Sequence, residues 1–286
     1  MEVILVIVGP TGVGKTKLSI ELAKKYKGII INADATQIYK ELDIGSAKIK
    51  KEEMEGIKHY LIDFVEPTQD YTVSDYQRDI RKILDSHKND FVIIVGGTGL
   101  YINAALFDYE FSNRLEIDLS NYSNMELLSM CQEIDKDVDI HVNNRIRLEN
   151  YLKKEKKECR EPKLLYECLF VGLTTPRDHL YTIINERVDK MFDEGLVEEV
   201  RYLKNKYSDA NILKRAIGYK EVIGYLNGEY SLEASIELVK KNSRHYAKRQ
   251  YTWFNNKLDV KWFNVQYENF SNTINDVSEY IDSMNK

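Results

Sequence analysis

Near its start the chain carries a phosphate-binding loop between a strand-like run and a helix-like run. The loop follows the apolar residues 3–8, precedes the helical pattern of residues 17–26, and reads Gly9-Pro10-Thr11-Gly12-Val13-Gly14-Lys15-Thr16. In this G-x-x-x-x-G-K-T pattern the glycines turn backbone N–H groups toward a diphosphate, the lysine adds a charge, and the threonine hydroxyl can ligate Mg²⁺. The helix that begins there adds the positive end of its dipole. We therefore expect a phosphorylated ligand, for which ATP or GTP is the usual inference.

Short apolar runs predict the strands of a parallel sheet. Residues 3–8, 91–95 and 168–173 are continuous apolar segments rich in Val and Ile, as expected of strands buried on both faces. Weaker strand candidates are residues 28–32, 60–64 and 260–263. Strands that alternate with helices imply a right-handed parallel sheet with its ligand at the carboxyl ends of the strands. We predict an α/β fold, a P-loop NTPase-like parallel sheet flanked by helices.

Helical patterns divide the rest of the chain into two parts. Residues 74–86 form one helix, with Ser74 as the expected N-cap and Gln77 at the capping-box position. The stretch 108–164 has no strong strand run and shows two helical patterns of its own. We predict a small helical insertion domain there, within a catalytic core of residues 1–107 and 165–286. The expected helices of the insertion and of the C-terminal part are residues 124–134, 144–157, 232–254 and 273–284.

The composition is that of a globular protein that can bury a core, since 43% of the 286 residues are hydrophobic and 30% are charged. No apolar stretch approaches the roughly 18–20 residues of a membrane span. Met1 and Glu2 lead straight into the first strand, so we expect neither a signal peptide nor membrane association. Cys131, Cys159 and Cys168 have no metal or disulfide spacing, which suits the reducing cytoplasm. We expect a cytoplasmic protein, by default a monomer.

Polar residues follow two predicted strands at the edge where a phosphate would bind. Asp34 comes directly after residues 28–33 and could hold Mg²⁺, act as a general base or cap the next helix. Residues 96–101 read Gly-Gly-Thr-Gly-Leu-Tyr, whose glycines indicate either close backbone approach or a tight strand-to-helix turn. Thr98 offers a hydroxyl in this turn. Because the ends of parallel strands converge, we favour a functional role for Asp34.

Three groups of cations are notable in a chain with a net charge of −5. Lys214 and Arg215 precede a predicted helix; a lone arginine is usually solvated, but a departing diphosphate needs such a charge. Residues 239–257 hold six Lys or Arg among aromatics and no acidic residue, which suits a phosphate backbone and unstacked bases. Residues 145–163 hold eight basic and four acidic residues, a balance common on solvated helices.

In combination these segments resemble the tRNA dimethylallyltransferases, also called tRNA isopentenyltransferases. The resemblance begins at the Gly-Pro-Thr opening of the P-loop and continues in order through residues 32–39, 42–48, 59–63, 95–101, 215–221 and 248–253. It implies that the P-loop holds the diphosphate of dimethylallyl diphosphate rather than ATP. It also implies that the acceptor is the N6 amine of the tRNA adenosine at position 37, just 3′ of the anticodon, flipped out of its loop.

The resemblance assigns roles to individual residues. Asp34 matches the general base, which an adenine amine needs because its lone pair is spread into the ring. Arg215 matches an arginine on the diphosphate, and Thr98 completes the implied catalytic set. Mg²⁺ at Thr16 would screen the leaving group, whose implied contacts are Gly9, Thr11, Gly12, Val13, Gly14, Lys15 and Thr16. Implied tRNA contacts are the insertion 108–164 and Asp34, Ala35, Thr36, Gln37, Gly99, Arg145, Arg147, Lys248 and Arg249.

Departures from the family pattern bear on the tRNA contacts rather than on the chemistry. Ala35 stands where Ser is usual, Val142 where Pro is usual, and Asn255 where Arg is usual. Two alternatives remain open. An isopentenyltransferase acting on free AMP, ADP or ATP would not need a basic surface of tRNA size, and a P-loop metabolite kinase should carry an arginine-rich lid. The insertion and the acid-free residues 239–257 favour tRNA.

Overall fold

The computed structural model describes residues 3–111, 115–153 and 162–284. Contacts between residues divide the chain into two compact units. The first, which we call the core unit, joins Met1–Phe107 to Leu164–Lys286, and the second, the insertion unit, is Asp108–Lys163. The insertion predicted from the sequence, residues 108–164, differs from the second unit by one residue.

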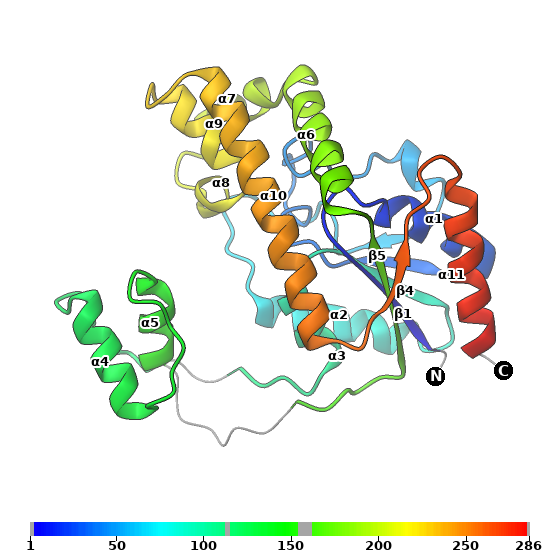
Figure 1. Cartoon of the computed structure of the whole chain (residues 1–286), viewed down its shortest axis with the longest axis horizontal. Coiled ribbons are helices and arrows are strands. Elements are labelled where there is room, and N and C mark those ends of the chain that lie inside the picture. The colour runs from blue at the N-terminus through cyan, green and yellow to red at the C-terminus, as the bar shows by residue number, and fades with distance from the viewer. Residues whose placement is uncertain (1–2, 112–114, 154–161, 285–286) are drawn as a thin grey trace. The chain divides into compact units, whose positions relative to one another are not determined.

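Six strands form an all-parallel sheet in the core unit, in the order β3-β2-β4-β1-β5-β6 (Figure 1). The strands are β1 (Ile4–Val8), β2 (Ile29–Asn32), β3 (His59–Tyr60), β4 (Val92–Val95), β5 (Cys168–Thr174) and β6 (Lys261–Asn264). The longest apolar runs of the sequence, β1, β4 and β5, lie inside the sheet, where both faces are covered. The predicted α/β fold with a parallel sheet is confirmed.

Helices cover both faces of the sheet. On one face lie α1 (Lys15–Tyr26) and α11 (Phe270–Met284), which Figure 1 shows side by side. On the other lie α2 (Val73–Ser86) and α3 (Gly99–Leu106). Because successive side chains of a strand point to opposite faces, β1 supplies apolar side chains to both cores. This packing fixes the carboxyl ends of the strands, where the P-loop lies.

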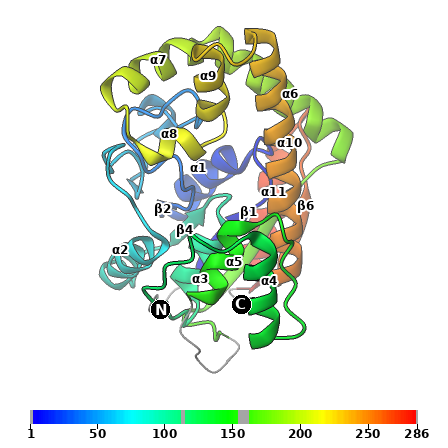
Figure 2. The same cartoon turned by 90° about the vertical axis from the view of Figure 1, so that its left-hand side faces the viewer.

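Five further helices follow β5. They are α6 (Arg177–Asp193), α7 (Leu196–Lys206), α8 (Asn211–Arg215), α9 (Tyr219–Leu226) and α10 (Leu232–Lys257). Figures 1 and 2 show α7, α8 and α9 gathered at one end of this unit. They share an apolar core with Ile38 and Leu42 from the segment after β2. Helix α10 packs against both α9 and α6 and ends against the sheet, where Phe254 is fully buried.

The insertion unit has a small apolar core of its own. It contains α4 (Asn124–Ile134) and α5 (Arg145–Leu152), and its buried residues are Leu119, Leu127, Cys131, Leu148 and Leu152. Helix α4 has the predicted bounds. Helix α5 ends five residues before the predicted limit at residue 157, and residues 154–157 lie outside the described part.

Two local predictions are wrong. Strand β3 covers only His59–Tyr60 instead of residues 60–64, because Leu61 and Asp63 have positive φ angles that an extended strand does not allow. Helix α2 is capped by Thr72 and Asp75, whose side chains and backbone N–H groups bond reciprocally, rather than by Ser74 and Gln77.

Within the described residues, none of the helices combines the length and the apolar character that crossing a membrane requires.

Candidate active site

The P-loop connects β1 to α1 through three glycines with positive φ. Gly9, Gly12 and Gly14 have φ angles of 140°, 84° and 100°, a region that side chains strain. A Cβ atom at Gly9 would also lie 2.5 Å from the carbonyl oxygen of Leu173 in β5. These positions therefore require glycine, and the loop can present its backbone N–H groups at the start of α1.

Lys15 folds its ammonium group back into this loop. Its Nζ donates to the carbonyl oxygens of Gly9 and Pro10, at 2.9 and 2.8 Å. Burial of that group lowers the pKa of Lys15 to about 7, against an opposing effect of Asp34 and with a further lowering by Arg187. The charge of the Lys15 ammonium group is thus only partly balanced by Asp34, as expected of a residue that binds an anionic ligand.

A cavity of about 1390 Å³ opens beside the loop. Its lining includes Thr11, Gly12, Gly14, Lys15 and Thr16 of the P-loop, Asp34 and Gln37 after β2, and Gly96 and Gly97 after β4. Arg187, Gln250 and most of a loop of residues 43–48 are also part of the lining. The ends of β1, β2 and β4 therefore bring together a phosphate site and a carboxylate, as predicted from their order in the sequence.

Asp34 is held in one orientation on this wall. Its Oδ1 accepts the backbone N–H groups of Thr36 and Gln37, at 2.8 and 3.3 Å, in an Asx-type turn. Asn32 Oδ1 accepts the backbone N–H of Asp34 itself. No described residue donates a hydrogen bond to Oδ2 of Asp34, so this oxygen can accept a proton from a bound molecule.

Thr98 connects the turn after β4 to the turn that carries Asp34. It is the N-cap residue of α3, and its Oγ1 accepts the backbone N–H of Ala35 at 3.0 Å. Its own backbone N–H donates to the carbonyl oxygen of Ala33 at 3.0 Å. Thr98 is not part of the cavity lining. Its geometry is that of a residue that positions the Asp34 turn.

Comparisons with known proteins give one family. A family model described as IPP transferase matches residues 37–257. The tRNA dimethylallyltransferases of Anoxybacillus flavithermus and Geobacillus thermodenitrificans are 41% and 44% identical to the chain, each match covering 98% of this chain and 96% of the relative. The chain belongs to the tRNA dimethylallyltransferase family. Its members are prenyltransferases, and this part of the prediction is confirmed.

Solved structures agree with this assignment. The full-length tRNA isopentenylpyrophosphate transferase of Bacillus halodurans matches with a TM-score of 0.77 and 37% identity, over 99% of this chain and 96% of that one. A eukaryotic dimethylallyltransferase described as acting on tRNA matches with a TM-score of 0.79 and 27% identity, over 92% of this chain and 74% of that one.

The structure places in this site an arginine that the sequence analysis did not predict there. Arg187 of α6 lines the cavity, and its Nη1 donates to Thr11 Oγ1 at 3.2 Å. Burial lowers the pKa of Arg187, and Asp34 opposes that effect. The sequence pattern around Arg187 could have indicated a buried position. Ile184 and Val188 are buried on one face of α6, and Arg187 lies between them, next to Val188. A charge beside such an apolar stripe is unusual on a solvated helix.

Two residues of α10 were also missed. Gln250 is only 5% exposed, and its amide accepts the Thr11 N–H at 2.9 Å and donates to the Gly97 carbonyl oxygen at 3.0 Å. Tyr246 lies near Asp34, and burial raises the pKa of its hydroxyl to about 12. The sequence analysis interpreted this helix by its basic residues and the aromatics among them, and gave neither Gln250 nor Tyr246 a place in the site.

Other predicted site residues lie outside the cavity lining. Arg215 is exposed at the end of α8, and its charge opposes the rise that burial causes in the pKa of Tyr39. Its contact with the diphosphate stays a prediction. Lys248 and Arg249 are exposed on α10, as tRNA contacts must be. Gly99 packs closely on Trp253, whose ring a Cβ atom there would meet at 2.3 Å. Among the P-loop residues, Gly9 and Val13 support the loop from behind the cavity wall.

In the insertion unit the two predicted tRNA contacts differ. Arg145 directs its guanidinium to the carbonyl oxygens of Leu119 and Tyr122, both at 2.8 Å, and pairs with Glu149 at 2.6 Å. These contacts hold the loop before α4 to α5. Arg147 is exposed. The tRNA contacts of both residues stay predictions, and Arg147 has the more suitable surface position.

Proposed function

We propose that this chain transfers a dimethylallyl group from dimethylallyl diphosphate to the N6 amine of the adenosine at position 37 of tRNA. One observation carries the proposal: in a tRNA dimethylallyltransferase family member, a P-loop and a carboxylate with a free oxygen, Asp34 Oδ2, line the same cavity. The P-loop then binds a leaving group and not an energy source. The reaction needs no nucleoside triphosphate, since the allylic ester bond itself supplies the driving force.

The proposed reaction needs a base for the amine proton and cations for the leaving diphosphate. The amine nitrogen attacks the allylic carbon, so an N–C bond forms while the C–O bond to the diphosphate breaks and its electron pair leaves with the oxygen. Asp34 takes the proton that the amine loses. The P-loop N–H groups, Lys15 and Arg187 stabilise the diphosphate, on which negative charge develops.

The chain offers a suitable ligand for Mg²⁺. Exposed Thr16 lines the cavity at the start of α1, where the P-loop would hold the diphosphate. Mg²⁺ keeps several waters and commonly binds substrate phosphates with only one or two protein ligands. Among the described residues no cluster of three His, Cys, Asp or Glu forms a dedicated metal cage. A hydroxyl plus diphosphate oxygens therefore fits, and the bound ion would neutralise charge on the leaving group.

The remaining parts of the proposal concern the partner and the assembly. The exposed cations Lys248 and Arg249 on α10 support contact with the tRNA backbone. We propose that the chain acts as a monomer. We propose a cytoplasmic location, where tRNA is present.

The test is modification of tRNA in vitro. Purified protein, dimethylallyl diphosphate, Mg²⁺ and unmodified tRNA should give N6-dimethylallyl adenosine at position 37, read by mass spectrometry of digested tRNA, without ATP. Asp34→Asn should abolish transfer while tRNA affinity, measured by filter binding, stays within about twofold because the side chain keeps its shape. Transfer to free AMP but not to tRNA would establish the alternative isopentenyltransferase, and phosphorylation of a metabolite by ATP would establish a kinase.

A further inference from the structure

The side-chain amide of Gln37 has a defined orientation in the cavity. Its Nε2 lies 3.2 Å from the carbonyl oxygens of both Ser46 and Ala47. Carbonyl oxygens only accept hydrogen bonds, so the nitrogen of the amide must face them, and both of its hydrogens have partners. The oxygen Oε1 is therefore directed away from these carbonyls. Gln37 lines the cavity three residues after Asp34, which is bonded to its backbone N–H.

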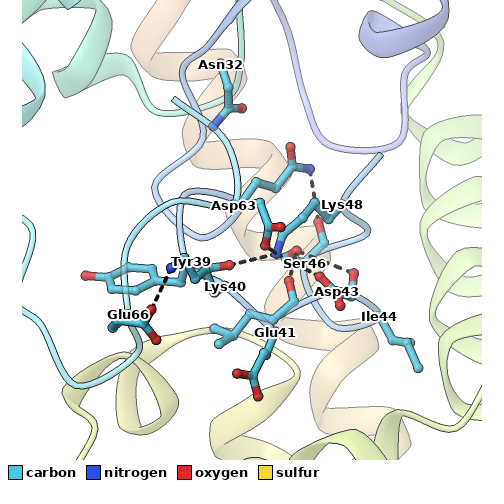
Figure 3. Close-up of polar contacts among 12 residues, drawn as sticks. Asn32, Tyr39, Lys40, Glu41, Asp43, Ile44, Ser46, Lys48, Asp63 and Glu66 are labelled. Atoms are coloured by element: carbon cyan, nitrogen blue, oxygen red, sulfur yellow. Dashed lines mark hydrogen bonds and ion pairs between the residues drawn. The ribbon is translucent and has the colours of Figure 1, made fainter. Parts of the chain in front are cut away.

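The two carbonyls belong to the 43–48 loop, which Lys48 holds from one side. The side chain of Lys48 is 6% exposed, and its Nζ donates to three oxygens at 2.7 Å: the Tyr39 carbonyl, Asp43 Oδ1 and Asp63 Oδ1 (Figure 3). Three donors meet three acceptors, so the ammonium group is fully satisfied. Lys48 thereby ties its own loop to the segment after β2 and to the segment after β3.

Glu199 of α7 holds the same loop from the other side. Its carboxylate accepts three consecutive backbone N–H groups, those of Asp43, Ile44 and Gly45, at 3.2, 2.7 and 3.1 Å. The Tyr219 hydroxyl donates to the same carboxylate at 2.7 Å. A Cβ atom at Gly45 would lie 2.6 Å from the Tyr219 ring, so the loop packs directly on this pair.

The backbone of the loop is strained where it meets Gln37. Ala47, whose carbonyl accepts from Gln37, has a φ of 45°. Leu61 and Asp63, on the segment that Lys48 joins to the loop, have φ angles of 55° and 54°. Non-glycine residues are uncommon in this region, and such conformations persist only when the surrounding contacts enforce them. Lys48 and Glu199 supply those contacts.

We propose that the 43–48 loop, held by Lys48 and Glu199, is a positioning element that makes Gln37 an acceptor-only contact for a nucleobase in the cavity. The proposal rests on the function proposed above. With its amide hydrogens bonded to the loop, Gln37 offers only Oε1, which suits an amine or ring N–H of the target base or its neighbour. A base edge with an acceptor at that point would meet another acceptor and be rejected. Lys48 and Glu199 act through Gln37: the Lys48 ammonium group spends its three donors on protein oxygens, and Glu199 is not part of the cavity lining.

A double-mutant cycle tests this coupling, with an unmodified anticodon stem-loop RNA as acceptor. Gln37→Met and Lys48→Met should each lower kcat/KM for the RNA about tenfold, the value of one hydrogen bond to a buried partner. The double variant should be no worse than the lower single variant, because without the amide the loop has nothing to orient. KM for dimethylallyl diphosphate should stay unchanged in all three. Lys48→Arg, which keeps a donor, should recover part of the loss.

The control is Lys40→Met, which removes a similar ion pair nearby: Lys40 bonds Glu66 at 2.6 Å and is 43% exposed (Figure 3). This variant should behave as wild type. If Lys48→Met lowers the melting temperature markedly, Glu199→Gln replaces it in the same cycle. Losses that multiply to about a hundredfold in the double variant would overturn the proposal, since independent effects add in free energy. A wild-type protein that transfers nothing to RNA would instead refute the proposed function.

Discussion

At the scale of single residues, the site contains two basic side chains, Lys15 and Arg187, whose charged forms are disfavoured by burial. Burial lowers the pKa of Lys15 to about 7 and also lowers the pKa of Arg187. The charge of Arg187 adds to the lowering of the Lys15 pKa, and Asp34 is the carboxylate that favours the charged form of both. A bound diphosphate would add negative charge beside Lys15 and Arg187 and so favour the charged form of both.

This state of Lys15 predicts proton uptake on ligand binding. At pH 8 the free amine is mostly neutral, and a bound diphosphate should restore the cation, so wild type should take up about one proton more than Lys15→Arg, which is always charged. Calorimetry with inorganic diphosphate in buffers of different ionisation enthalpy measures this difference. The comparison cancels protons exchanged by the diphosphate itself. Equal uptake by the two proteins would show that Lys15 is already charged in the free site.

The same shift fixes the sign of a stability effect. The unfolded chain keeps the Lys15 proton up to about pH 10.5, whereas the folded ligand-free chain loses it near pH 7. Between these values the unfolded state binds more protons, so the contribution of Lys15 to folding stability rises with pH across that window.

Sequence reasoning found the residues whose role depends on local spacing. The P-loop is a contiguous motif, and Asp34 directly follows a predicted strand, so both could be placed without a structure. Arg187 contacts Thr11 across 176 residues, and no local pattern encodes that approach. The sequence does place this charge beside an apolar stripe of α6. That pattern alone does not show which residues the charge contacts.

At the scale of elements, α10 has a buried face and an exposed basic face. Its buried residues Ala247, Gln250 and Phe254 face the interior at helical spacing, while Lys248 and Arg249 are exposed. Gln250 contacts both the P-loop and the turn after β4. A tRNA bound on the outer face and a diphosphate bound in the loop would therefore contact the same helix.

Gln250→Glu tests the inner face of α10. A carboxylate can still accept the Thr11 N–H, but it cannot donate to the Gly97 carbonyl oxygen and places charge against it. We expect kcat/KM for dimethylallyl diphosphate to fall about ten- to a hundredfold, which corresponds to roughly 1.4–3 kcal/mol for a disrupted buried hydrogen bond. Asn255→Ala, an exposed change on the same helix, is the control and should have wild-type kinetics. Wild-type kinetics in Gln250→Glu would show that the bridge does not set the P-loop geometry.

Helices and strands could be predicted from the sequence where a single local pattern determines the type of secondary structure. The strands β1, β4 and β5 follow from continuous apolar runs, and the helix Asn124–Ile134 follows from its helical pattern. The predicted strand 60–64 was too long, because the backbone N–H groups of Asp63 and Phe64 donate to the carbonyl oxygens of Gln37 and Ile38 instead of to a strand of the sheet. Which segment the residues after β3 pair with depends on the tertiary structure, and a single sequence does not show it.

At the scale of the whole molecule, the chain has two units with separate apolar cores. The insertion unit buries Leu119, Leu127, Cys131, Leu148 and Leu152 among themselves. The core unit contains the sheet, the P-loop and every residue that lines the described cavity. Stability and catalysis should therefore respond separately to changes in the two units.

Leu148→Ala in α5 tests this separation. Removing a fully buried leucine should destabilise the insertion unit by about 2–5 kcal/mol. Hydrogen exchange should then accelerate in α4 and α5 but not in β1. If this unit contacts tRNA as predicted, KM for tRNA should rise while KM for dimethylallyl diphosphate stays constant. Ile146→Ala, at a side chain that is 75% exposed on the same helix, should change exchange little. Faster exchange in β1 would show that the units fold as one, and an unchanged KM for tRNA in a loosened unit would contradict its predicted tRNA contact.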